Sequence, residues 1–575
     1  MKKIGCTFFC LLSFLALYPS ISKAQNLPFS KQKQIMHEQI EDAYHPKKAS
    51  KPTKPQSVIP KKLHSVTTNS SIFTVQVNVD SLGHNIVGDA ANEPNLTLNP
   101  SNPNQMAIGW RQFDDVANNF RQAGWAYTSN GGQSWNFPGS IDAGVFHSDP
   151  VLDYDSSGNF YYNSLTVDSL GGFLCYVYRS SDGGATWDTG VYANGGDKQW
   201  MAIDRSAGPG MGNIYSFWSV FYTACPPNMF TRSSDAGDTY EACTDVDGEP
   251  YWGTMAIGPN GELYIVGGEQ VIDSLVVSKT MNAQTPGSTI LWEPPVGVYM
   301  DGSVSSGASV NPAGLLGQAN IDVDRSNGPG QGNVYVLSAI SRLSNGDPGD
   351  IMFSRSTDGG LSWEFPIAIN DDAMNMTQWM GTMAVAPNGR IDAVWLDTRE
   401  DIFGYDSSAL YYSYSIDQGI TWSSNEKLSP LFDPHVGYPN QNKMGDYFDL
   451  ISENAGAHLA WTNTLNGEED VYYSFIVPPV GTGVEALSTP VQMKIWPNPS
   501  SGIFEFSLSG KTNFYTTETN FARIEIYSVL GEKIMEQSIQ KSKVQIDLST
   551  QSKGIYFAKL LLPNGNSLVK KMVKN

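Results

Sequence analysis

The sequence predicts an all-β protein, a seven-bladed β-propeller followed by a small C-terminal β-sandwich. Three observations support this fold class. Gly (55 residues), Pro (33) and aromatic residues (11%) are abundant among the 575 residues, as expected for short strands joined by many tight turns. One strand–turn–strand pattern recurs seven times in the middle of the chain, and a short turn motif recurs five times in the same region. A six-bladed propeller is the alternative.

Composition excludes several classes of protein. Hydrophobic residues make up 40% of the chain and charged residues 16%, so a large core can form and global disorder is excluded. The formal net charge of -21 argues against a nucleic-acid partner, which needs a basic surface. Residues 73–479 hold 14 Lys and Arg against 47 acidic residues, a balance of -33.

We expect no metal and no cofactor, because 7 His and 5 Cys are too few for a His-rich or Cys-rich metal protein. Calcium is the one ion that the sequence leaves open. Residues 153–158 (DYDSSG) resemble the start of a calcium loop but lack the downstream Glu ligand.

The first residues are predicted to be an export signal. Lys2 and Lys3 precede an apolar stretch, and small residues before Gln25 suit a cut that removes residues 1–24. No later stretch reaches the roughly 18 apolar residues of a membrane span, so none is expected. Residues 25–72, rich in Pro, Lys, Ser and Thr, are predicted to be a flexible linker or pro-segment.

Export also permits disulfide formation. Three cysteines remain after removal of the signal: Cys175, Cys225 and Cys243. Cys225 and Cys243 are the candidate pair, but the odd count leaves the pairing open.

The repeated strand–turn–strand pattern defines the predicted propeller, residues 73–479. Its copies are 50 to 66 residues apart and start at Asn95, Val151, Met201, Met255, Ile321, Met383 and Phe448. We interpret each copy as the first two strands of a four-stranded blade. The strand predicted over residues 73–79 can complete the last blade, which would close the ring and hide its edges.

The turn motif has the form Ser/Thr-x-Asp-x-Gly-x-Ser/Thr-Trp. An Asp side chain can accept bonds from turn amides, Gly permits positive φ, and the aromatic ring can cover the hairpin base. We therefore assign a structural role, not a catalytic one, to its third residue, which is Asn130, Asp182, Asp235, Asp358 or Asp417. A decayed copy is expected near residues 278–292. The motif resembles the Asp-box (BNR repeat) of sialidase-like β-propellers.

Residues 491–575, after a linker at 480–490, are predicted to form the sandwich. Alternating strands surround the motifs Trp496-Pro497-Asn498-Pro499, Gly502, Leu530-Gly531 and Gly554-Ile555-Tyr556, and the end is rich in Lys. These features resemble the C-terminal sorting domain of the type IX secretion system of Bacteroidota. The resemblance implies contact with the type IX machinery and a secreted or outer-membrane-surface location in a Gram-negative bacterium. An ordinary carbohydrate-binding or adhesive sandwich is the alternative.

The resemblance to propellers implies a site over the central channel, on the face where the innermost strands begin. The seven segments that lead into those strands, here called the lead-in segments, are residues 92–94, 147–150, 197–201, 250–255, 317–320, 377–383 and 443–447. From them and from nearby loops, the candidate ligand-binding residues are Glu93, Arg111, His147, Asp149, Gln199, Trp200, Trp252, Gln378, Trp379, Asp397, Arg399, Glu400 and Asp446. Exposed Trp beside carboxylates and amides would suit a sugar pocket. The alternative is that Trp200, Trp252 and Trp379 plug the channel as core residues.

Three functions remain open on the sequence. The first is a glycan-binding or glycoside-hydrolase-like surface protein, and the second is a non-catalytic protein-interaction or adhesion propeller. The third is an exo-sialidase, which the family pattern would equip with three Arg, a Tyr–Glu pair and an Asp. Four Arg can face the site, namely Arg111, Arg121, Arg342 and Arg399. Asp149 with Glu400 is a possible acid pair for another glycosidase.

Overall fold

The structure is a computed structural model that describes Tyr44 and residues 70–269, 273–372, 375–401, 403–404, 406–479, 492–509, 515–517, 520–528, 533–539, 543–561 and 567–575. The expected signal (1–24), most of the expected linker (25–72) and the second linker (480–490) lie outside the described residues. The chain divides into two compact units, Met1–Pro478 and Pro479–Asn575. Strands dominate both units, and the described residues include one short 3-10 helix, η1 (Val220–Tyr222).

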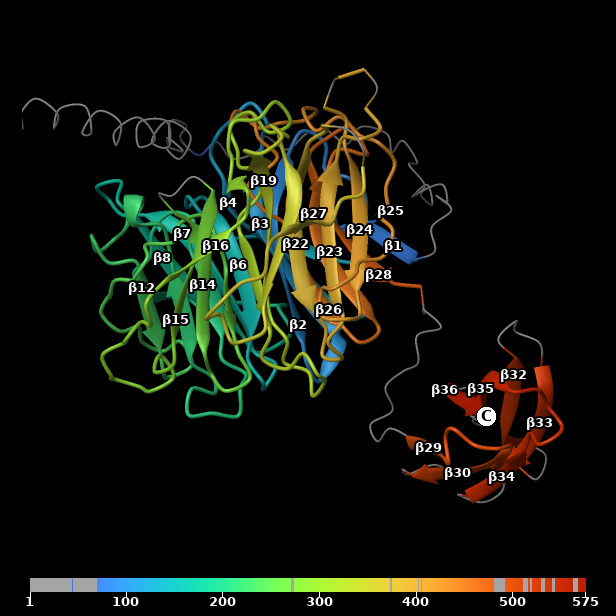
Figure 1. The fold of residues 1–575 in the computed structure, drawn as a ribbon. Coiled ribbons are helices and arrows are strands. Elements are labelled where there is room, and N and C mark those ends of the chain that lie inside the picture. Colours follow the sequence, from blue (N-terminus) through green and yellow to red (C-terminus); the bar gives the residue numbers. More distant parts are fainter. Residues whose placement is uncertain are drawn as a thin grey trace, which may run out of the picture. The chain divides into compact units, whose positions relative to one another are not determined.

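The described part of the first unit contains seven antiparallel β-sheets, and five of them have four strands (Figure 1). The sheets are numbered in chain order. The first consists of β2 (Ala90–Asn99), β3 (Asn102–Phe113), β4 (Gln122–Thr128) and β5 (Asn136–Ile141), and the second of β6 (Ser148–Tyr154), β7 (Phe160–Val167), β8 (Phe173–Ser180) and β9 (Val191–Tyr192). The third consists of β10 (Trp200–Ile203), β11 (Ile214–Phe217) and β12 (Phe230–Ser233). The fourth consists of β13 (Met255–Ile257), β14 (Leu263–Gly268), β15 (Ser274–Thr280) and β16 (Val296–Tyr299). The fifth consists of β17 (Gly302–Ser303), β18 (Asn320–Val323), β19 (Val334–Arg342), β20 (Asp350–Ser356) and β21 (Ile367–Ala368). The last two consist of β22 (Gln378–Val385), β23 (Ile391–Asp397), β24 (Ala409–Ser415) and β25 (Glu426–Lys427); and β26 (Asp449–Glu453), β27 (Gly456–Asn463), β28 (Asp470–Val477) and β1 (Ser71–Gln76).

The seventh sheet joins the two ends of the first unit. β1 pairs antiparallel with β28, in a register that runs from Ser71 opposite Val477 to Gln76 opposite Tyr472. The N-terminal strand expected from the sequence therefore completes the last sheet, and the outer edge of β28 is paired.

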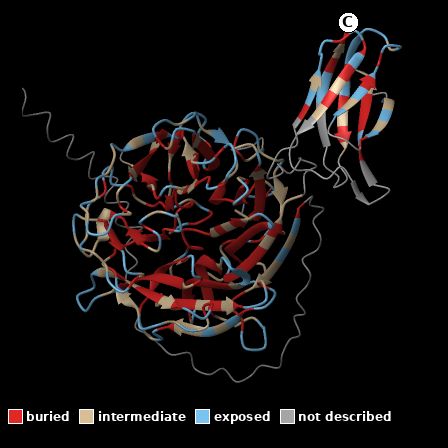
Figure 2. Ribbon diagram, turned by 90° about the horizontal axis from the view of Figure 1, so that it is seen from below, coloured by how far each residue is buried: buried red, intermediate tan, exposed pale blue. Residues whose placement is uncertain are grey.

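The seven sheets lie around a common centre (Figure 2). Each first strand contacts the first strand of the following sheet, in the order β2, β6, β10, β13, β18, β22 and β26, and β26 contacts β2. Between five of these neighbours, a side chain of one sheet accepts a hydrogen bond from a backbone N–H of the next. The acceptors and donors are Asp449 and Leu96 (2.8 Å), Asn95 and Leu152 (2.7 Å), Asp153 and Ile203 (2.7 Å), Thr254 and Ile321 (3.0 Å), and Asp322 and Val385 (2.8 Å). These bonds satisfy edge amides that would otherwise be buried without a partner.

The five turn motifs share one hydrogen-bond pattern at the end of the sheets opposite the lead-in segments. The Asp182 carboxylate accepts bonds from the Thr186 N–H (3.0 Å) and the Thr186 hydroxyl (2.6 Å). Asn130 accepts from the Ser134 N–H (3.1 Å) and donates its amide to the Ser134 hydroxyl (2.8 Å). The remaining copies repeat the pattern of Asp182 with Asp235, Asp358 and Asp417.

A longer variant of this turn follows β15, within the stretch where a decayed copy is expected. Asn282 takes the place of the Asp, and its side-chain oxygen accepts bonds from the Thr280 hydroxyl (3.0 Å) and the Leu291 N–H (2.9 Å). An isolated bridge between Thr280 and Trp292 closes the turn, and the indole N–H of Trp292 donates to the carbonyl of Asp245 (3.0 Å).

The third sheet differs from the expected four strands. After β12, the chain returns to the sheet at a single bridge between Phe230 and Thr244. A disulfide between Cys225 and Cys243 lies beside that bridge, and Cys175 is a buried free thiol. The disulfide therefore fixes the outer edge of this sheet where a fourth strand is absent among the described residues.

The second unit is a β-sandwich. One sheet contains β29 (Gln492–Trp496), β30 (Ile503–Ser509) and β34 (Lys543–Asp547), and the other contains β31 (Tyr515–Thr517), β32 (Asn520–Ser528), β33 (Lys533–Ile539), β35 (Gly554–Leu561) and β36 (Ser567–Lys574). Both sheets contribute to one hydrophobic core that includes Phe504, Phe506, Ile524 and Ile526.

Two motif residues of this unit tie its ends together. The side chain of Asn498 donates to the carbonyl of Lys571 (2.8 Å) and accepts from the N–H of Val573 (2.8 Å). The ammonium of Lys574 donates to the carbonyl of Ser549 (2.8 Å). The first motif and the Lys-rich end therefore form one packed edge, whereas Leu530-Gly531 lies outside the described residues.

Candidate functional site

Each of the seven lead-in segments contains a residue with positive φ. These residues are Glu93 (51°), Asp149 (46°), Lys198 (57°), Trp252 (54°), Gly317 (139°), Met380 (55°) and Gly445 (95°). A left-handed conformation costs a non-Gly residue on the order of 1 kcal/mol or more. In the first, second and sixth sheets the strand register also shifts at this point, as in a β-bulge. Bulges redirect side chains, and two of these shifts lie at the charged residues Glu93 and Asp149.

We call the resulting group the axial charge cluster: Glu93, Arg111, Asp149, Lys198, Lys443 and Asp446. All six side chains are at most 5% exposed. The Lys443 ammonium lies 2.7 Å from the Asp446 carboxylate and 3.3 Å from that of Glu93. Lys198 contacts Asp446 and lies 3.4 Å from Asp149, while Arg111 lies 3.2 Å from Glu93. The cluster therefore ties together the first, second, third and seventh sheets.

Burial and neighbouring charges set the protonation states of the cluster in different directions. Burial raises the pKa of Glu93 to about 8, against the opposing effect of Arg111, Lys198 and Lys443. Burial also disfavours ionised Asp446, but Lys198 and Lys443 outweigh it and hold the pKa of this carboxyl below its usual range. Burial disfavours charged Lys198, yet Asp149, Asp446 and Glu93 keep its pKa above the usual value. Removing Lys198 would leave the buried Asp446 carboxylate without one of its two cations.

A second group of candidates gathers at the ends of β22 and β23, in the sixth sheet. Gln378 donates to the Asp397 carboxylate (3.2 Å), and the Arg399 guanidinium bonds to Asp397 (2.9 Å). Glu400 accepts a bond from the Tyr411 hydroxyl (2.9 Å) and contacts Lys427. Asp149 and Glu400, the acid pair suggested by the sequence, therefore have different partners, Lys198 for the first and Lys427 with Tyr411 for the second.

The three candidate Trp rings are buried. Trp379 is fully enclosed, and its indole N–H donates to the Ser408 hydroxyl (3.0 Å). Trp252 packs edge to face on Tyr251, with ring centroids 5.2 Å apart. Trp200 is 8% exposed and meets Tyr447 edge to face at 5.5 Å. This burial favours the packing role that the sequence leaves open beside sugar stacking.

The last two candidates bind neighbouring groups. One ring nitrogen of His147 lies 3.0 Å from the Ser164 hydroxyl, and burial lowers the pKa of His147 to about 4, so the ring is neutral near pH 7. The side-chain amide of Gln199 donates to the carbonyl of Asp149.

The four Arg that could face a sialidase-like site bind different partners. Arg111 pairs with Glu93, and Arg121 donates to the Ser148 hydroxyl (3.2 Å) while its guanidinium lies over the ring of Phe146 (4.6 Å). The partners of the other two Arg are carboxylates: Asp301 and Asp350 for Arg342, and Asp371 and Asp397 for Arg399.

A small cavity lies beside the axial charge cluster, and we call it the axial cavity. Its volume is about 10 Å³, which is room for about one water molecule. Residues of five sheets line it, among them Trp200, Thr254, Gln318, Asn320, Thr382 and Tyr447. The described residues of its lining include no charged side chain, although Trp200 and Tyr447 lie within two residues of Lys198 and Asp446.

The sequence-based candidates omit two features of this region. The first is the pair of lysines, Lys198 and Lys443, although residues 73–479 contain only four Lys and two of them fall in lead-in segments. The second is the segment 304–316, which precedes β18. Its residue Asn311 donates to the carbonyl of Gly445 (2.8 Å) and accepts from the N–H of Met444 (2.9 Å). The sequence does indicate an inserted segment here, because the distance between the starts of two successive copies of the repeat is longest between Met255 and Ile321.

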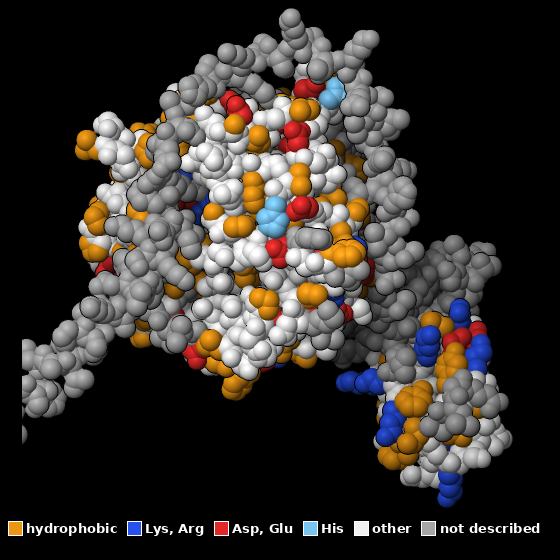
Figure 3. Space-filling model, turned by 90° about the horizontal axis from the view of Figure 1, so that it is seen from above, with side chains coloured by type: hydrophobic (Ala, Val, Ile, Leu, Met, Phe, Trp, Pro, Cys, Tyr) orange, Lys and Arg blue, Asp and Glu red, His pale blue; other side chains and the backbone are white. Residues whose placement is uncertain are grey.

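The face that carries the lead-in segments has acidic and hydrophobic side chains and few Lys or Arg (Figure 3). The described residues contain no group of three or more His, Cys, Asp or Glu placed to hold a metal ion. In the calcium-like turn, the Asp155 carboxylate accepts the N–H groups of Ser157 and Asn159, each at 2.9 Å. Across the described ranges, no helix is long and apolar enough to cross a membrane.

Comparison with known families identifies the second unit. Residues 494–575 match the family model of the secretion system C-terminal sorting domain. The predicted sorting domain is therefore confirmed. This match supports handling by the type IX secretion machinery and a secreted or outer-membrane-surface location. No curated protein matches the chain.

Solved structures resemble the chain only distantly. A protein of unknown function from Dyadobacter fermentans is 12% identical, with 71% of this chain and 99% of that chain covered and a TM-score of 0.41. A leech intramolecular trans-sialidase is 12% identical, covering 62% and 70%, with a TM-score of 0.39. A GH74 xyloglucanase from Xanthomonas campestris is 12% identical, covering 84% and 65%, with a TM-score of 0.34. Similarity at this level carries no argument about activity.

Proposed function

We propose that this chain is an exported, closed seven-bladed β-propeller that binds a surface glycan without cleaving it. The cyclic order of contacts among the seven first strands and the pairing of β1 with β28 support the closed ring. The sorting-domain match supports a site of action outside the cell. The proposal includes no cofactor.

The state of the central carboxylates is the observation that carries the proposal. Glycoside cleavage needs a carboxylic acid and a second carboxylate that both reach the scissile bond. Glu93, Asp149 and Asp446 are instead buried and bound to Arg111, Lys198 and Lys443. Carboxyl groups enclosed in this way are not available to a substrate, which supports the non-catalytic half of the proposal, and a glycan array tests the binding half.

A protein-interaction or adhesion propeller is the second candidate. Two loop residues favour it, because Leu343 after β19 and Phe403 after β23 are 60% and 74% exposed. Single exposed apolar side chains are common on protein surfaces, so these two residues support this candidate less than a contiguous patch would.

An exo-sialidase has less support. Tyr411 and Glu400 form a hydrogen-bonded pair, and the Arg399 guanidinium lies 4.4 Å over the Tyr411 ring. However, Arg399 is held by Asp397 and Asp371, and the other candidate Arg residues have partners of their own. A sialidase would need three guanidinium groups available to bind a sialic acid carboxylate. The candidate Arg residues bind groups of this chain instead, so they do not support this function.

A glycan array combined with a panel of fluorogenic glycosides, sialosides included, tests the proposal on the full chain. We expect saturable binding to a subset of neutral glycans and no turnover above a no-enzyme control. Turnover that disappears in Asp149→Asn or Glu400→Gln would contradict binding without cleavage. Binding to extracellular proteins with no glycan signal would favour the second candidate.

A further inference from the structure

The axial charge cluster holds an amine against a carboxyl group in a buried site. The Lys198 ammonium contacts the Asp446 carboxylate and lies 3.9 Å from the Glu93 carboxyl, and all three side chains are at most 5% exposed. A lysine amine is a nucleophile towards carbonyl carbon once it loses a proton. Effective concentrations of groups positioned in this way can reach about 10⁵ M or more. The pair is therefore arranged as the two reactants of an amide bond between side chains.

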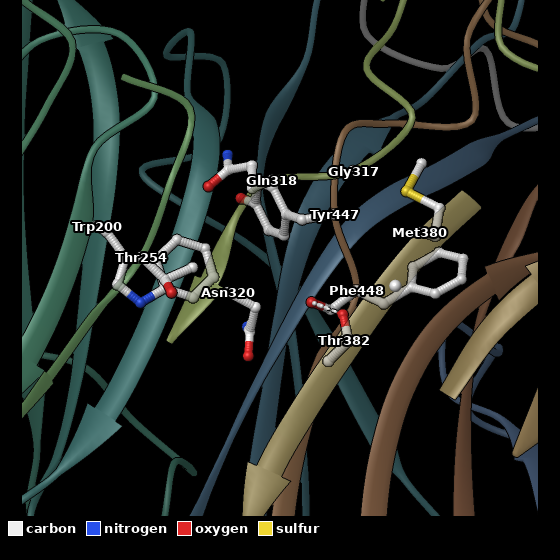
Figure 4. Close-up of a pocket in the computed structure, with 10 residues that line it drawn as sticks. Trp200, Thr254, Gly317, Gln318, Asn320, Met380, Thr382, Tyr447 and Phe448 are labelled. Carbon is white, nitrogen blue, oxygen red and sulfur yellow. Dashed lines mark hydrogen bonds between the residues drawn. The ribbon is translucent and has the colours of Figure 1, made fainter. Parts of the chain in front are cut away.

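Contacts outside the ion pair fix the approach of these two residues. The ring of Trp200 meets that of Tyr447 edge to face, with centroids 5.5 Å apart (Figure 4). These rings belong to the lead-in segments that carry Lys198 and Asp446. The Tyr447 hydroxyl donates to the carbonyl of Pro150 (2.8 Å), in a third lead-in segment. The segments therefore remain in place when the charges of the pair change.

The two oxygens of the Asp446 carboxyl group have different surroundings. Oδ2 faces Lys198 and Lys443, whereas Oδ1 accepts the backbone N–H of Leu315 (2.8 Å). Addition of an amine to a carboxyl carbon moves negative charge onto the oxygen that stays, and a fixed N–H donor at that oxygen stabilises this charge. The N–H of Leu315 therefore has the position of an oxyanion donor.

Two further carboxyl groups of the cluster can carry the protons that amide formation moves. Burial raises the pKa of Glu93 to about 8, so this carboxyl holds a proton near pH 7. Lys443 contacts both Glu93 (3.3 Å) and Asp446 (2.7 Å), which places the two carboxyl groups beside one another. Asp149 lies 3.4 Å from the Lys198 ammonium and can accept a proton from it. Positioned carboxyl groups of this kind act as general acids and bases.

We propose that the side chains of Lys198 and Asp446 become joined by an amide bond after the chain folds, with Glu93 and Asp149 moving the protons. The bond between Nζ of Lys198 and Cγ of Asp446 forms, and one C–O bond of Asp446 breaks. An ammonium and a carboxylate thus become one amide and one water molecule. The cross-link joins the third and seventh sheets between residues 248 apart in the chain, and it is independent of the proposed function.

The protons balance within the cluster. Lys198 gives one proton to Asp149, and its nitrogen lone pair attacks Cγ of Asp446 while Glu93 protonates Oδ2. The nitrogen then returns a proton to Glu93, and Asp149 passes its proton to Oδ2, which leaves as water. Glu93 and Asp149 end as they began, and no oxidant or cofactor takes part. The product is a neutral amide in place of a buried ion pair, which removes the cost of keeping two charges out of water.

Mass spectrometry of the purified full chain tests the cross-link. After reduction of the disulfide, we expect the intact chain to be lighter than its sequence requires by the mass of one water molecule. A tryptic digest should contain a branched peptide that carries both Lys198 and Asp446. Lys198→Arg keeps a positive charge but cannot form this amide, and Glu93→Gln keeps the size of the side chain but cannot carry the proton. Both variants should therefore have the full mass.

The matched control for Glu93→Gln is Glu364→Gln, at an exposed side chain, which should keep the wild-type mass deficit. Circular dichroism melts verify that the variants fold, and the mass of the wild-type chain decides the inference even if one of them does not. A wild-type chain of full mass means that the pair stays ionic and overturns the inference. A branch at Lys443 instead of Lys198, or a mass deficit that persists in folded Lys198→Arg, also overturns it.

Discussion

The axial charge cluster and the axial cavity are neighbours along the chain, yet they treat buried polar groups in opposite ways. Lys198 and Asp446 belong to the cluster, where acids and bases pair with one another. Trp200 and Tyr447 line the cavity, where the Gln318 amide has no partner among the described residues. The cluster therefore compensates its buried charges, whereas the cavity leaves a buried amide uncompensated.

The largest expected effect comes from breaking the cluster. Replacing Lys198 with Met leaves Asp446 and Asp149 without one of their cations, so we expect a loss of about 3 to 5 kcal/mol in the free energy of unfolding. Urea denaturation measures this loss. The control is Lys279→Met, which removes an ion pair with the more exposed Glu293 and should cost less than about 1 kcal/mol. Equal losses would contradict a structural role specific to the cluster.

A pH series separates the two regions next. Because burial raises the pKa of Glu93 to about 8, the folded state keeps a proton that the unfolded chain releases near its ordinary, lower pKa. This contribution to stability is complete at acidic pH and is lost as pH rises towards 8. Glu93→Gln mimics the protonated form. The free energy of unfolding of this variant should therefore fall less than that of the wild type as pH rises, and the difference should be a few kcal/mol at most. The control is Glu364→Gln, because the Glu364 side chain is 53% exposed and its replacement should leave the dependence of stability on pH as in the wild type. If Glu93→Gln also shows the wild-type dependence on pH, the raised pKa of Glu93 is wrong.

A smaller effect of opposite sign is expected in the cavity. Gln318→Met replaces an unpaired buried amide with an apolar side chain of similar length, so the chain should gain about 1 kcal/mol of stability. Thermal denaturation of wild type and variant measures the change. A loss of more than about 1 kcal/mol would mean that the amide is satisfied within the fold, and the contrast between the two regions would disappear.

The smallest effect is expected at the turn motifs, far from both regions. Asp417→Asn keeps an acceptor for the Thr421 N–H, as Asn130 does for Ser134 in the first turn. The change should therefore cost less than about 1 kcal/mol, whereas Asp417→Ala should cost about 1 to 2 kcal/mol, as for loss of a capping residue. Chemical denaturation of both variants checks the order.

The sequence predicts the repeat better than the centre. The seven starting residues, such as Val151 and Ile321, lie in or next to the first strands, because strand and turn signals are local. The expected strand at 73–79 is also present as β1 and pairs with β28. Side-chain partners across the axis could not be predicted in this way, because Lys198 and Asp446 are 248 residues apart and the period of a repeat does not show which side chains pair.

The unpredicted parts of the candidate site have two physical causes. The segment 304–316 occurs in one repeat alone, so no other copy shows how it packs against Gly445. Burial of Trp379 and Trp252 follows from how adjacent sheets pack, and an exposed and a buried Trp have the same local pattern.

A double-mutant cycle between Lys198→Met and Asp446→Leu tests most directly whether the lead-in segments of distant sheets meet on one axis. The two residues lie in lead-in segments of the third and seventh sheets, and their side chains are in contact. We expect a coupling energy of about 2 to 3 kcal/mol, because each single change leaves the other charge buried. A coupling within about 0.5 kcal/mol of zero, as for independent sites, would contradict the convergence on which the cluster, the cavity and the proposed function depend.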